Sequence, residues 1–337
     1  MTVTIIVGGF WGDEGKGKII SYIAYSENPA IIARSGVGTN AGHTVVFEGK
    51  KYGLRMIPSG FTSKKSRLLI GAGVLVDPDI FLKEIEETGC KDRIAIDYQA
   101  GVIESQHKEI DQKDKHFSKK IGSTGTGCGP ANQDRAKRTL RLAKEFPQLE
   151  PYLTDVSTEI NEAIEAGKNV VLEGTQGTML SLFHGTYPFV TSKDVSAPQI
   201  CSDVGIGPTK VDEVIIVFKA FMTRVGEGPM PGTLSEEEME KRGWVEHGTV
   251  TGRARRSAPI DFDVARKAVR LNGATQIALT KLDIIFPEVA GAKSADKLSK
   301  ESLEFISEIE KETGVPVTFV GTGPEAEALI DLREEKL

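Results

Sequence analysis

A short apolar run that leads directly into a glycine-rich loop constrains the fold of this chain more than any other feature. Residues 3–7 (VTIIV) have the length and unbroken hydrophobicity of a parallel strand covered on both faces. Glycines and lysines follow at residues 8–18, and apolar residues then recur at helical spacing over residues 19–24. This strand–loop–helix order is the setting of a phosphate-binding loop, because the backbone N–H groups at a helix N-terminus bind anions.

Apolar and helical segments continue to alternate along the chain. Further buried strands are predicted at residues 30–33, 169–172, 214–218, 276–280 and 316–320. Helices are predicted after the N-cap pair Asp77-Pro78, at residues 263–271 and at residues 299–313. A hairpin is predicted at residues 44–47 and 52–57, and solvated loops or helix faces at residues 108–120 and 235–242.

This order indicates an α/β fold, with a large, mostly parallel central sheet, helices on both faces and a P-loop-like phosphate loop after the first strand. The sequence contains no internal repeat and no linker-like stretch rich in proline or serine. We therefore expect a single domain over residues 1–337.

Charge and composition exclude several classes of protein. The chain has 42 basic and 48 acidic residues, a net charge of −6, which argues against long-range attraction to nucleic acid. No apolar run approaches the roughly 20 residues of a membrane-spanning helix, and no basic leader precedes the first strand. Cys90, Cys128 and Cys201 are odd in number and far apart, which fits neither a disulfide framework nor a zinc knuckle. We expect a cytoplasmic enzyme that binds neither nucleic acid nor membrane.

The loop at residues 12–18 (GDEGKGK) is the first candidate site. Its spacing satisfies GxxxxGK, which ends at Lys18, but Ile19 stands where a P-loop places the Ser or Thr that holds magnesium. Asp13 is therefore the expected magnesium ligand, while the backbone and the two lysines, Lys16 and Lys18, would bind phosphate. The alternative is a glycine-rich turn with solvated lysines.

His43 lies among glycines and polar residues in the string TNAGHT at residues 39–44. A lone histidine is commonly a structural hydrogen-bonding residue at the end of an element. This loop has little apolar cover, so His43 and Asp13 are also candidates for an acid–base or electrophilic pair. The sequence leaves both interpretations open.

Residues 280–283 (TKLD) stand at the C-terminal end of a predicted strand. A [N/T]KxD string in that place is the guanine-reading device of GTP-binding proteins. The Asp283 carboxylate would accept from N1–H and the 2-amino group, and the stem of Lys281 would cover the base. Such short strings also arise by chance. Residues 321–324 (GTGP) follow the last strand and are placed to close over a base.

Three further loops carry polar donors. Residues 251–256 (TGRARR) cluster arginines, whose planar forks suit carboxylates and phosphates, although such clusters also occur on solvated surfaces. Residues 121–130, with Arg138 downstream, and residues 173–178, with Thr191 downstream, supply hydroxyl, amide and N–H donors. The alternative for both is a plain glycine turn.

Taken together, these strings resemble the adenylosuccinate synthetase family. The matching segments run in the family's order over nearly the whole chain, and the pair WGDEGKGK and HGTYPFVTS is highly specific. They are WGDEGKGK (11–18), NAGHTVV (40–46), IPSG (57–60), GSTGTGCGPA (122–131), EGTQGTML (173–180), HGTYPFVTS (184–192), TRVGEGPMPG (223–232), TGRARR (251–256), TKLD (280–283) and GTGP (321–324).

The resemblance implies a reaction in which IMP, L-aspartate and GTP give adenylosuccinate, GDP and phosphate through 6-phosphoryl-IMP. It implies that Asp13 is the base for the N1 proton of IMP and, with the carbonyl of Gly42, a ligand of Mg²⁺. His43 and Lys16 would stabilise the transferred phosphoryl group, and Gln176 would hold the region of the 6-oxygen.

The resemblance also implies three sets of binding residues. The GTP site would comprise Gly12, Asp13, Glu14, Gly15, Lys16, Gly17, Lys18, Gly42, His43, Thr44, Arg255, Lys281, Leu282, Asp283, Gly321, Thr322 and Gly323. The IMP site would comprise Asp13, Glu14, Gly15, Lys16, Asn40, Ala41, Gly42, His43, Thr124, Arg138, Gln176, Thr191 and Arg253. The aspartate site would comprise Thr249, Val250, Thr251, Gly252, Arg253, Ala254 and Arg255.

The family pattern further implies a homodimer in which Arg138 reaches the IMP phosphate of the neighbouring subunit. Three positions depart from that pattern: Ala254 and Thr126 stand where arginines are usual, and Phe183 replaces a common acidic residue. The chain is also shorter than the usual bacterial and eukaryotic members, and in this it resembles the archaeal ones.

Two rival classes fit the sequence less well. A GTP-binding switch protein would carry Ser or Thr where Ile19 stands, with a downstream DxxG. A nicotinamide dehydrogenase would carry GxGxxG with its later acidic residue after the first strand, and this pattern is not found there.

Overall fold

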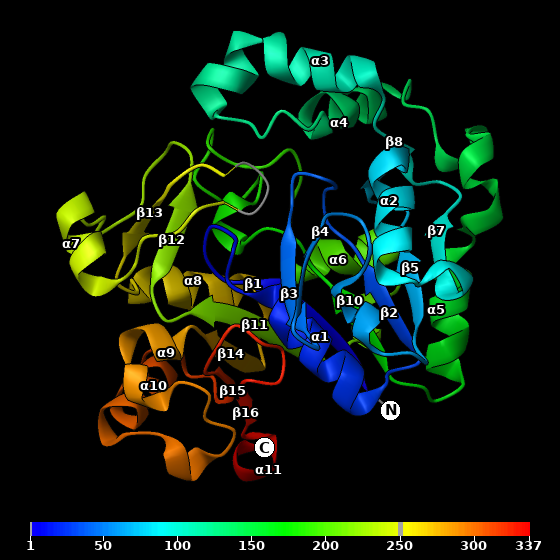
Figure 1. The fold of residues 1–337 in the computed structure, drawn as a ribbon. Coiled ribbons are helices and arrows are strands. Elements are labelled where there is room, and N and C mark those ends of the chain that lie inside the picture. The colour runs from blue at the N-terminus through cyan, green and yellow to red at the C-terminus, as the bar shows by residue number, and fades with distance from the viewer. Residues whose placement is uncertain (1, 249–251) are drawn as a thin grey trace.

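The computed structural model describes residues 2–248 and 252–337, and these residues form an α/β fold around one ten-stranded sheet (Figure 1). All neighbouring strands are parallel except the antiparallel pair β15–β16. From one edge to the other, the strands are β16 (Leu329–Asp331), β15 (Val317–Gly321), β14 (Gln276–Thr280), β11 (Glu213–Lys219), β1 (Val3–Gly8), β10 (Val170–Glu173), β2 (Ile31–Arg34), β5 (Arg67–Ile70), β7 (Ile94–Asp97) and β9 (Leu153–Thr154). The predicted large, mostly parallel sheet is confirmed.

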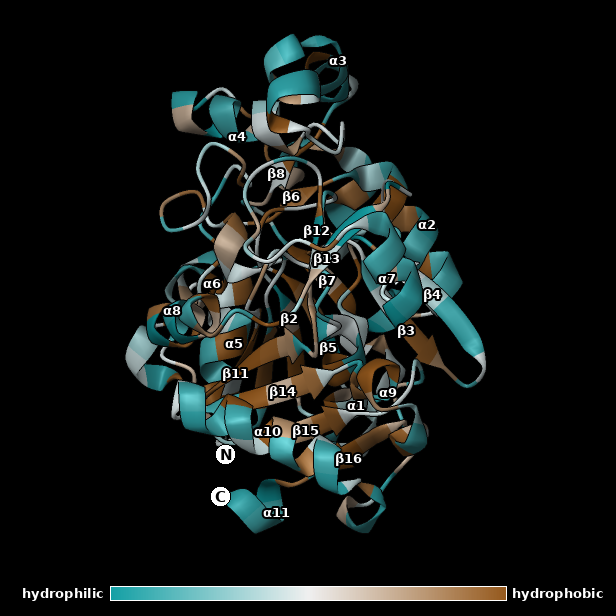
Figure 2. Cartoon of the chain, turned by 90° about the vertical axis from the view of Figure 1, so that its left-hand side faces the viewer, coloured by the Kyte–Doolittle hydropathy of each residue, from teal (hydrophilic) through white to brown (hydrophobic). Residues whose placement is uncertain are grey.

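Helices cover both faces of this sheet, as predicted, because its strands are apolar on both sides. Val3, Ile5 and Val7 of β1 pack into one buried cluster, with side chains of α5 (Val156–Glu165), α6 (Ala197–Val204), α8 (Phe262–Asn272) and α10 (Lys300–Thr313). Ile6 packs into the opposite cluster, with side chains of α1 (Lys16–Glu27) and α2 (Pro78–Thr88). Figure 2 shows the apolar strands β11, β14 and β15 beneath the more polar outer surface of helices such as α8 and α10.

Smaller elements surround the sheet. They are the hairpin β3 (His43–Phe47) and β4 (Lys50–Leu54), the pair β6 (Leu75–Val76) and β8 (Gly101–Val102), the pair β12 (Met222–Val225) and β13 (Arg255–Ala258), and the helices α3 (Ser105–Lys113), α4 (Cys128–Lys137), α7 (Glu236–Arg242), α9 (Leu282–Ile285) and α11 (Arg333–Lys336). Helices α3 and α4 lie together at the end of the molecule opposite the C-terminus (Figure 1). Among the described residues, no helix is long and apolar enough to cross a membrane.

Most predicted elements are present, and the local signals explain their ends. Strand β14 matches its predicted range, and Asp77 caps α2 by accepting from the N–H of Ile80 at 3.4 Å. The hairpin prediction to residue 57 is wrong, since β4 ends at Leu54. The next three backbone N–H groups, at residues 55–57, donate to the buried carboxylate of Glu84 instead of to a strand. The charged stretch at 108–120 forms much of α3 and the turn that follows it.

Candidate active site

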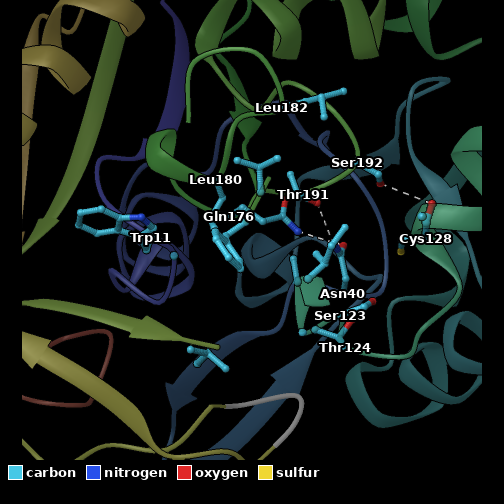
Figure 3. Close-up of a pocket in the computed structure, with 18 of the residues that line it drawn as sticks. Trp11, Asn40, Ser123, Thr124, Cys128, Gln176, Leu180, Leu182, Thr191 and Ser192 are labelled. Atoms are coloured by element: carbon cyan, nitrogen blue, oxygen red, sulfur yellow. Dashed lines mark hydrogen bonds between the residues drawn. The ribbon is translucent and has the colours of Figure 1, made fainter. Parts of the chain in front are cut away.

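A cavity of about 520 Å³ is lined by the loops that follow strands β1, β2 and β10 (Figure 3). It brings together predicted residues that lie far apart in the sequence: Gly12, Asp13, Lys16, Asn40, Ala41, Gly42, His43, Thr124, Gln176, Thr191 and Arg253. The carboxyl ends of parallel strands meet at one edge of a sheet, and ligands of open α/β sheets bind in the crevice outside that edge.

The other predicted residues lie outside the cavity wall. Glu14, Gly15, Gly17, Lys18 and Thr44 belong to the loop and to the elements α1 and β3 beside it. Lys281, Leu282, Asp283 and the loop at 321–323 follow the adjacent strands β14 and β15. Arg138 is exposed at the end of α4, and Gly252, Ala254 and Arg255 lead into β13. Thr249, Val250 and Thr251 lie outside the described residues.

The phosphate loop is built around the buried carboxylate of Glu14. Its Oε1 accepts from the N–H groups of Phe10 at 3.0 Å and Gly12 at 2.7 Å, and its Oε2 pairs with Lys16 Nζ at 3.0 Å. Asp13 has a φ of 60° and Gly15 a φ of 95°, both in the left-handed region, so the backbone turns sharply before α1. The Glu14 side chain therefore braces its own loop, and only its backbone is left to face a ligand.

The two lysines of this loop have different partners. Lys16 lines the cavity and also donates to the backbone carbonyl of Gln176. Lys18 donates instead to the carbonyls of Gly323 and Ala328, at 2.8 and 2.6 Å, and to that of Glu325. All three donors of the Lys18 ammonium group are therefore occupied by carbonyls, so Lys18 has no free donor for a phosphate, and its predicted role as a charge for phosphate stays a prediction.

Asp13 lies among cations at the mouth of the cavity. Its carboxylate is 25% exposed and pairs with Arg255 Nη2 at 2.9 Å. Burial raises the pKa of Asp13, although the charges of Arg255 and Lys219 oppose this rise. A carboxylate with a raised pKa is a stronger base than an ordinary aspartate.

Behind Arg255, the carboxylate of Glu246 holds three cations. It pairs with Arg255, with Lys219 at 2.8 Å and with Lys281 at 3.5 Å. Burial alone would raise the pKa of Glu246, but these cations hold it at about 2. The sequence analysis missed Glu246 and Lys219; the signal for Lys219 was a lysine at the end of the apolar run of β11.

His43 is held by a buried ionic cluster that sequence reasoning also missed. Its Nδ1 lies 2.5 Å from Glu173 Oε1, which also accepts from Arg34 at 2.9 Å and from the hydroxyl of Ser59 at 2.8 Å. Burial lowers the pKa of His43 to about 4 despite the Glu173 carboxylate. Burial would raise the pKa of Glu173, but its bonds to His43 and the charge of Arg34 hold it below the usual value.

The other ring nitrogen of His43 is available for chemistry. Nε2 is buried and has no hydrogen-bond partner among the described residues, although His43 lines the cavity. Since Glu173 fixes Nδ1 as the donor nitrogen, Nε2 is the ring nitrogen left to interact with a ligand. This geometry favours the functional interpretation of His43 over the purely structural one.

Polar side chains from three loops form another wall of the cavity. Gln176 Nε2 donates to Asn40 Oδ1 at 3.0 Å, and Asn40 Nδ2 donates to Thr191 Oγ1 at 3.1 Å, so the three side chains point toward one another (Figure 3). Thr124 contributes a hydroxyl that lies 3.1 Å from that of Thr126. Thr126 stands where an arginine is usual in the family, and its hydroxyl bonds within its own loop.

The TKLD string at residues 280–283 begins at the last residue of strand β14. Lys281 has a φ of 63° and is largely exposed, while Oδ1 of Asp283 is buried and without a hydrogen-bond partner among the described residues. Arg253, from the predicted aspartate loop, donates to the carbonyl of Gly122 at 3.0 Å and so ties that loop to the glycine loop. Phe183 is 72% exposed and lies against His184.

This fold, with a glycine-rich anion loop, an oriented histidine and a TKxD string around one crevice, defines a nucleotide-dependent phosphoryl-transfer enzyme. A sequence model of adenylosuccinate synthetase matches residues 5–146 and 139–289. The adenylosuccinate synthetase of Methanococcus aeolicus is 61% identical over 336 residues, which cover 99% of this chain and 100% of that protein. That of Methanocaldococcus jannaschii is 60% identical over 99% of this chain and 98% of its own. The chain belongs to the adenylosuccinate synthetase family.

Solved structures agree with this assignment. A fully ligated adenylosuccinate synthetase from Plasmodium falciparum superposes with a TM-score of 0.90 at 26% identity, covering 98% of this chain and all of the other. A succinoaminodeoxyadenylate synthetase of cyanophage S-2L, bound to dGMP and dATP as an energy donor, has a TM-score of 0.80 at 25% identity over 98% and 95% of the two chains. The chain is a GTP-dependent ligase that joins L-aspartate to IMP to form adenylosuccinate. The expected likeness to short archaeal members is confirmed.

Proposed function

We propose that Asp13, His43, Lys16 and Gln176 catalyse this ligation in two steps within the cavity. In the first, the 6-oxygen of IMP attacks the γ-phosphorus of GTP, and GDP leaves. In the second, the aspartate amine attacks C6 and the C6–O bond breaks, so that the oxygen departs with the phosphate. The oxygen at C6 is a poor leaving group until it is phosphorylated, which is why GTP is consumed.

The observation that carries this proposal is the convergence of Asp13 and the unpartnered Nε2 of His43 on one cavity. Asp13 takes the proton from N1 of IMP, which leaves negative charge on the 6-oxygen. His43 accepts a proton at Nε2 when an anionic phosphoryl group arrives and then donates to it, while Nδ1 stays bonded to Glu173. Lys16 adds positive charge on the same wall.

Mg²⁺ fits the same residues. Among the described residues, no cluster of three or more His, Cys, Asp or Glu side chains could hold a metal by itself. Mg²⁺ is commonly bound through one or two carboxylates plus substrate phosphates, and Asp13 with the carbonyl of Gly42 supplies the protein share of such a set. When bound, the cation would neutralise phosphate charge.

The remaining assignments extend this proposal to the other substrates. Lys281, Asp283 and residues 321–323 would bind guanine, and the unpartnered Oδ1 of Asp283 supports this role. Arg253, Arg255 and residues 249–252 would bind aspartate. Asn40, Thr124, Thr191 and Gln176 would bind IMP, because they line the cavity beside Asp13.

Arg138 would complete the IMP site of a neighbouring subunit. In its own chain it is exposed and lies outside the cavity, so it fits a role in trans within a homodimer. We also propose that residues 1–337 act as one domain and that the enzyme works in the cytoplasm.

The two-step reaction is tested with IMP that carries ¹⁸O at the 6-position. We expect the label in the inorganic phosphate, because the C6–O bond breaks only after the oxygen has been phosphorylated. Label released into water, with unlabelled phosphate, would overturn the 6-phosphoryl intermediate. Asp13→Ala should form neither adenylosuccinate nor labelled phosphate, while its circular dichroism spectrum matches that of the wild type.

A further inference from the structure

Lys18 occupies the lysine position of the GxxxxGK spacing, yet its ammonium group serves another loop. The side chain leaves the first turn of α1, and only 7% of the residue is exposed. Nζ donates to the carbonyls of Gly323 at 2.8 Å, Ala328 at 2.6 Å and Glu325. An ammonium group has three donors, and one loop between β15 and β16 takes all three.

That loop depends on Lys18 for its shape. Three carbonyl dipoles that converge on one point repel one another unless a cation lies between them, and hydrogen bonds to charged groups are stronger than neutral ones. Backbone bonds hold the loop as well: the N–H of Thr322 donates to the carbonyl of Ala328 at 2.9 Å, and that of Ala328 donates to the carbonyl of Glu325 at 3.1 Å. Its ties to other segments run from the Thr322 hydroxyl to the carbonyl of Ala292 at 2.7 Å, from the N–H of Gly291 to the carbonyl of Thr322 at 2.7 Å, and from the N–H of Ala326 to the carbonyl of Val46 at 2.9 Å. Burial lowers the pKa of Lys18 to about 8, against the opposing charge of Asp283.

The same loop begins at the proposed guanine site. Strands β14 and β15 are parallel neighbours, so the string at 281–283 and the loop at 321–323 leave the sheet side by side. A side chain added at Gly321 would begin 3.1 Å from Cε of Lys18, which shows how closely the lysine stem passes beneath this loop.

We infer that Lys18 is a positioning residue for guanine recognition: it fixes the loop at 321–328 beside Asp283 and does not bind phosphate. This inference rests on the proposed guanine site. To bind a phosphate instead, Lys18 would have to give up three carbonyl partners at once. The carbonyls of Ala328 and Glu325 would keep one backbone donor each, at 2.9 and 3.1 Å, but that of Gly323 would have no donor among the described residues. Lys16, which lines the cavity, is the lysine placed for phosphate.

The test compares GTP with ITP, which lacks the 2-amino group that Asp283 would read. In Lys18→Met, the ratio of kcat/KM for GTP to that for ITP should fall at least tenfold. The loss should appear in the KM for GTP, while kcat at saturating GTP falls less than threefold. In the control Lys16→Met, kcat/KM should fall equally for both nucleotides, because their phosphates are identical.

The possible outcomes distinguish a failure of this inference from a failure of the proposed guanine site. If Lys18→Met lowers kcat/KM for GTP and ITP equally, Lys18 acts on phosphate and the inference is wrong. If Asp283→Asn leaves the GTP-to-ITP ratio unchanged, the proposed guanine site itself is wrong. Should Lys18→Met fail to fold, Lys18→Gln keeps two donors of the three, and it should show an intermediate ratio; an unchanged ratio would refute the inference.

Discussion

One carboxylate, that of Glu173, holds the orientation of His43, and Glu173→Gln tests whether this orientation matters for catalysis. Oε1 accepts from His43, Arg34 and the Ser59 hydroxyl, while Oε2 accepts from the N–H of Ser59 at 2.7 Å. An amide keeps only one acceptor oxygen. Whichever way it turns, its NH₂ group faces a donor: either Ser59 N–H or the three groups at Oε1.

The cost follows from the burial of the cluster. Arg34 and Glu173 are both fully buried, so the amide leaves a buried guanidinium without its counter-charge. Breaking a buried ion pair costs about 3–5 kcal/mol, and we expect a loss of that order in the free energy of unfolding. For a chain of this size this corresponds to a fall in Tm of roughly 4–7 °C.

Catalysis should suffer separately from stability. Without the carboxylate, Nδ1 of His43 loses its acceptor, and Nε2 is no longer held toward the cavity. We expect kcat to fall on the order of 10²-fold, the usual scale for an acid–base group, while the KM values for GTP and IMP change little. Steady-state kinetics measured well below the Tm of the variant would show this split.

Glu84→Gln is the matched control. Glu84 is 4% exposed, and its carboxylate accepts from the N–H groups of residues 55–57 at 2.7–2.9 Å, but it makes no described contact with His43. This variant should lose stability and keep its kcat. If Glu173→Gln also loses only stability and its kcat stays within threefold of wild type, then Glu173 is purely structural and our reasoning about His43 fails.

Three further predictions test other parts of the site. Because the folded pKa of His43 is about 4 and the unfolded value about 6.5, only the unfolded chain takes up this proton as the pH falls between them. The free energy of unfolding should therefore fall in that window by up to about 1.4 kcal/mol per pH unit more in wild type than in His43→Asn; parallel curves from urea titrations would contradict this. Asp283→Asn should weaken GTP at least tenfold and gain activity with XTP, since each lost charge-assisted bond costs about 1.5–3 kcal/mol; equal losses for both nucleotides would mean a supporting role only. Mixing the inactive variants Arg138→Leu and Asp13→Ala should restore activity, and no return after demonstrated subunit exchange would rule out a shared site.

The sequence predicted the elements that carry chemistry because their signals are local. An apolar run followed by glycines placed β1 and its loop, and the run at 276–280 placed β14 with the TKLD string at its end. Parallel strands end at one edge, so the topology then brings Asp13, His43 and Gln176 together without any contact being known in advance.

The partners of these residues could not be predicted, because they depend on strand register. Arg34 and Glu173 are the last residues of the apolar strands β2 and β10, and each alone is an ordinary charged residue at a strand end. They meet because the two strands are parallel neighbours that pair Glu173 with Arg34. More than one hundred residues separate the two strands, so neither strand's own sequence indicates that they pair.

Lys18 shows the opposite case, in which a local pattern and the contacts in the structure point to different partners. The GxxxxGK spacing indicates phosphate, but Lys18 meets carbonyls that lie 305 to 310 residues further along the chain. In this loop Asp13 stands at a position where a P-loop uses only its backbone. The lysine that lines the cavity is Lys16. A spacing rule assumes the loop geometry of its own family, and this loop is braced differently, by Glu14.

The proposed substrate sites follow the order of the strands in the sheet, which differs from the order of the same strands along the chain. Counted from the edge at β16, β15 and β14 are followed by the proposed guanine loops, and β1 is followed by the proposed phosphate loop. Strand β10 is followed by Gln176, and β2 by Asn40 and His43. In sequence these loops come in the order β1, β2, β10, β14 and β15, with the guanine loops last. Adjacent strands are about 4.8 Å apart, so the three spacings from β15 through β14 and β11 to β1 separate the proposed guanine loops from the proposed phosphate loop by roughly 14 Å. Beyond β1, the next strands, β10 and β2, carry the residues that we propose bind IMP. Insertions or deletions in the outer loops do not alter these spacings, which is how a short chain can retain the whole reaction.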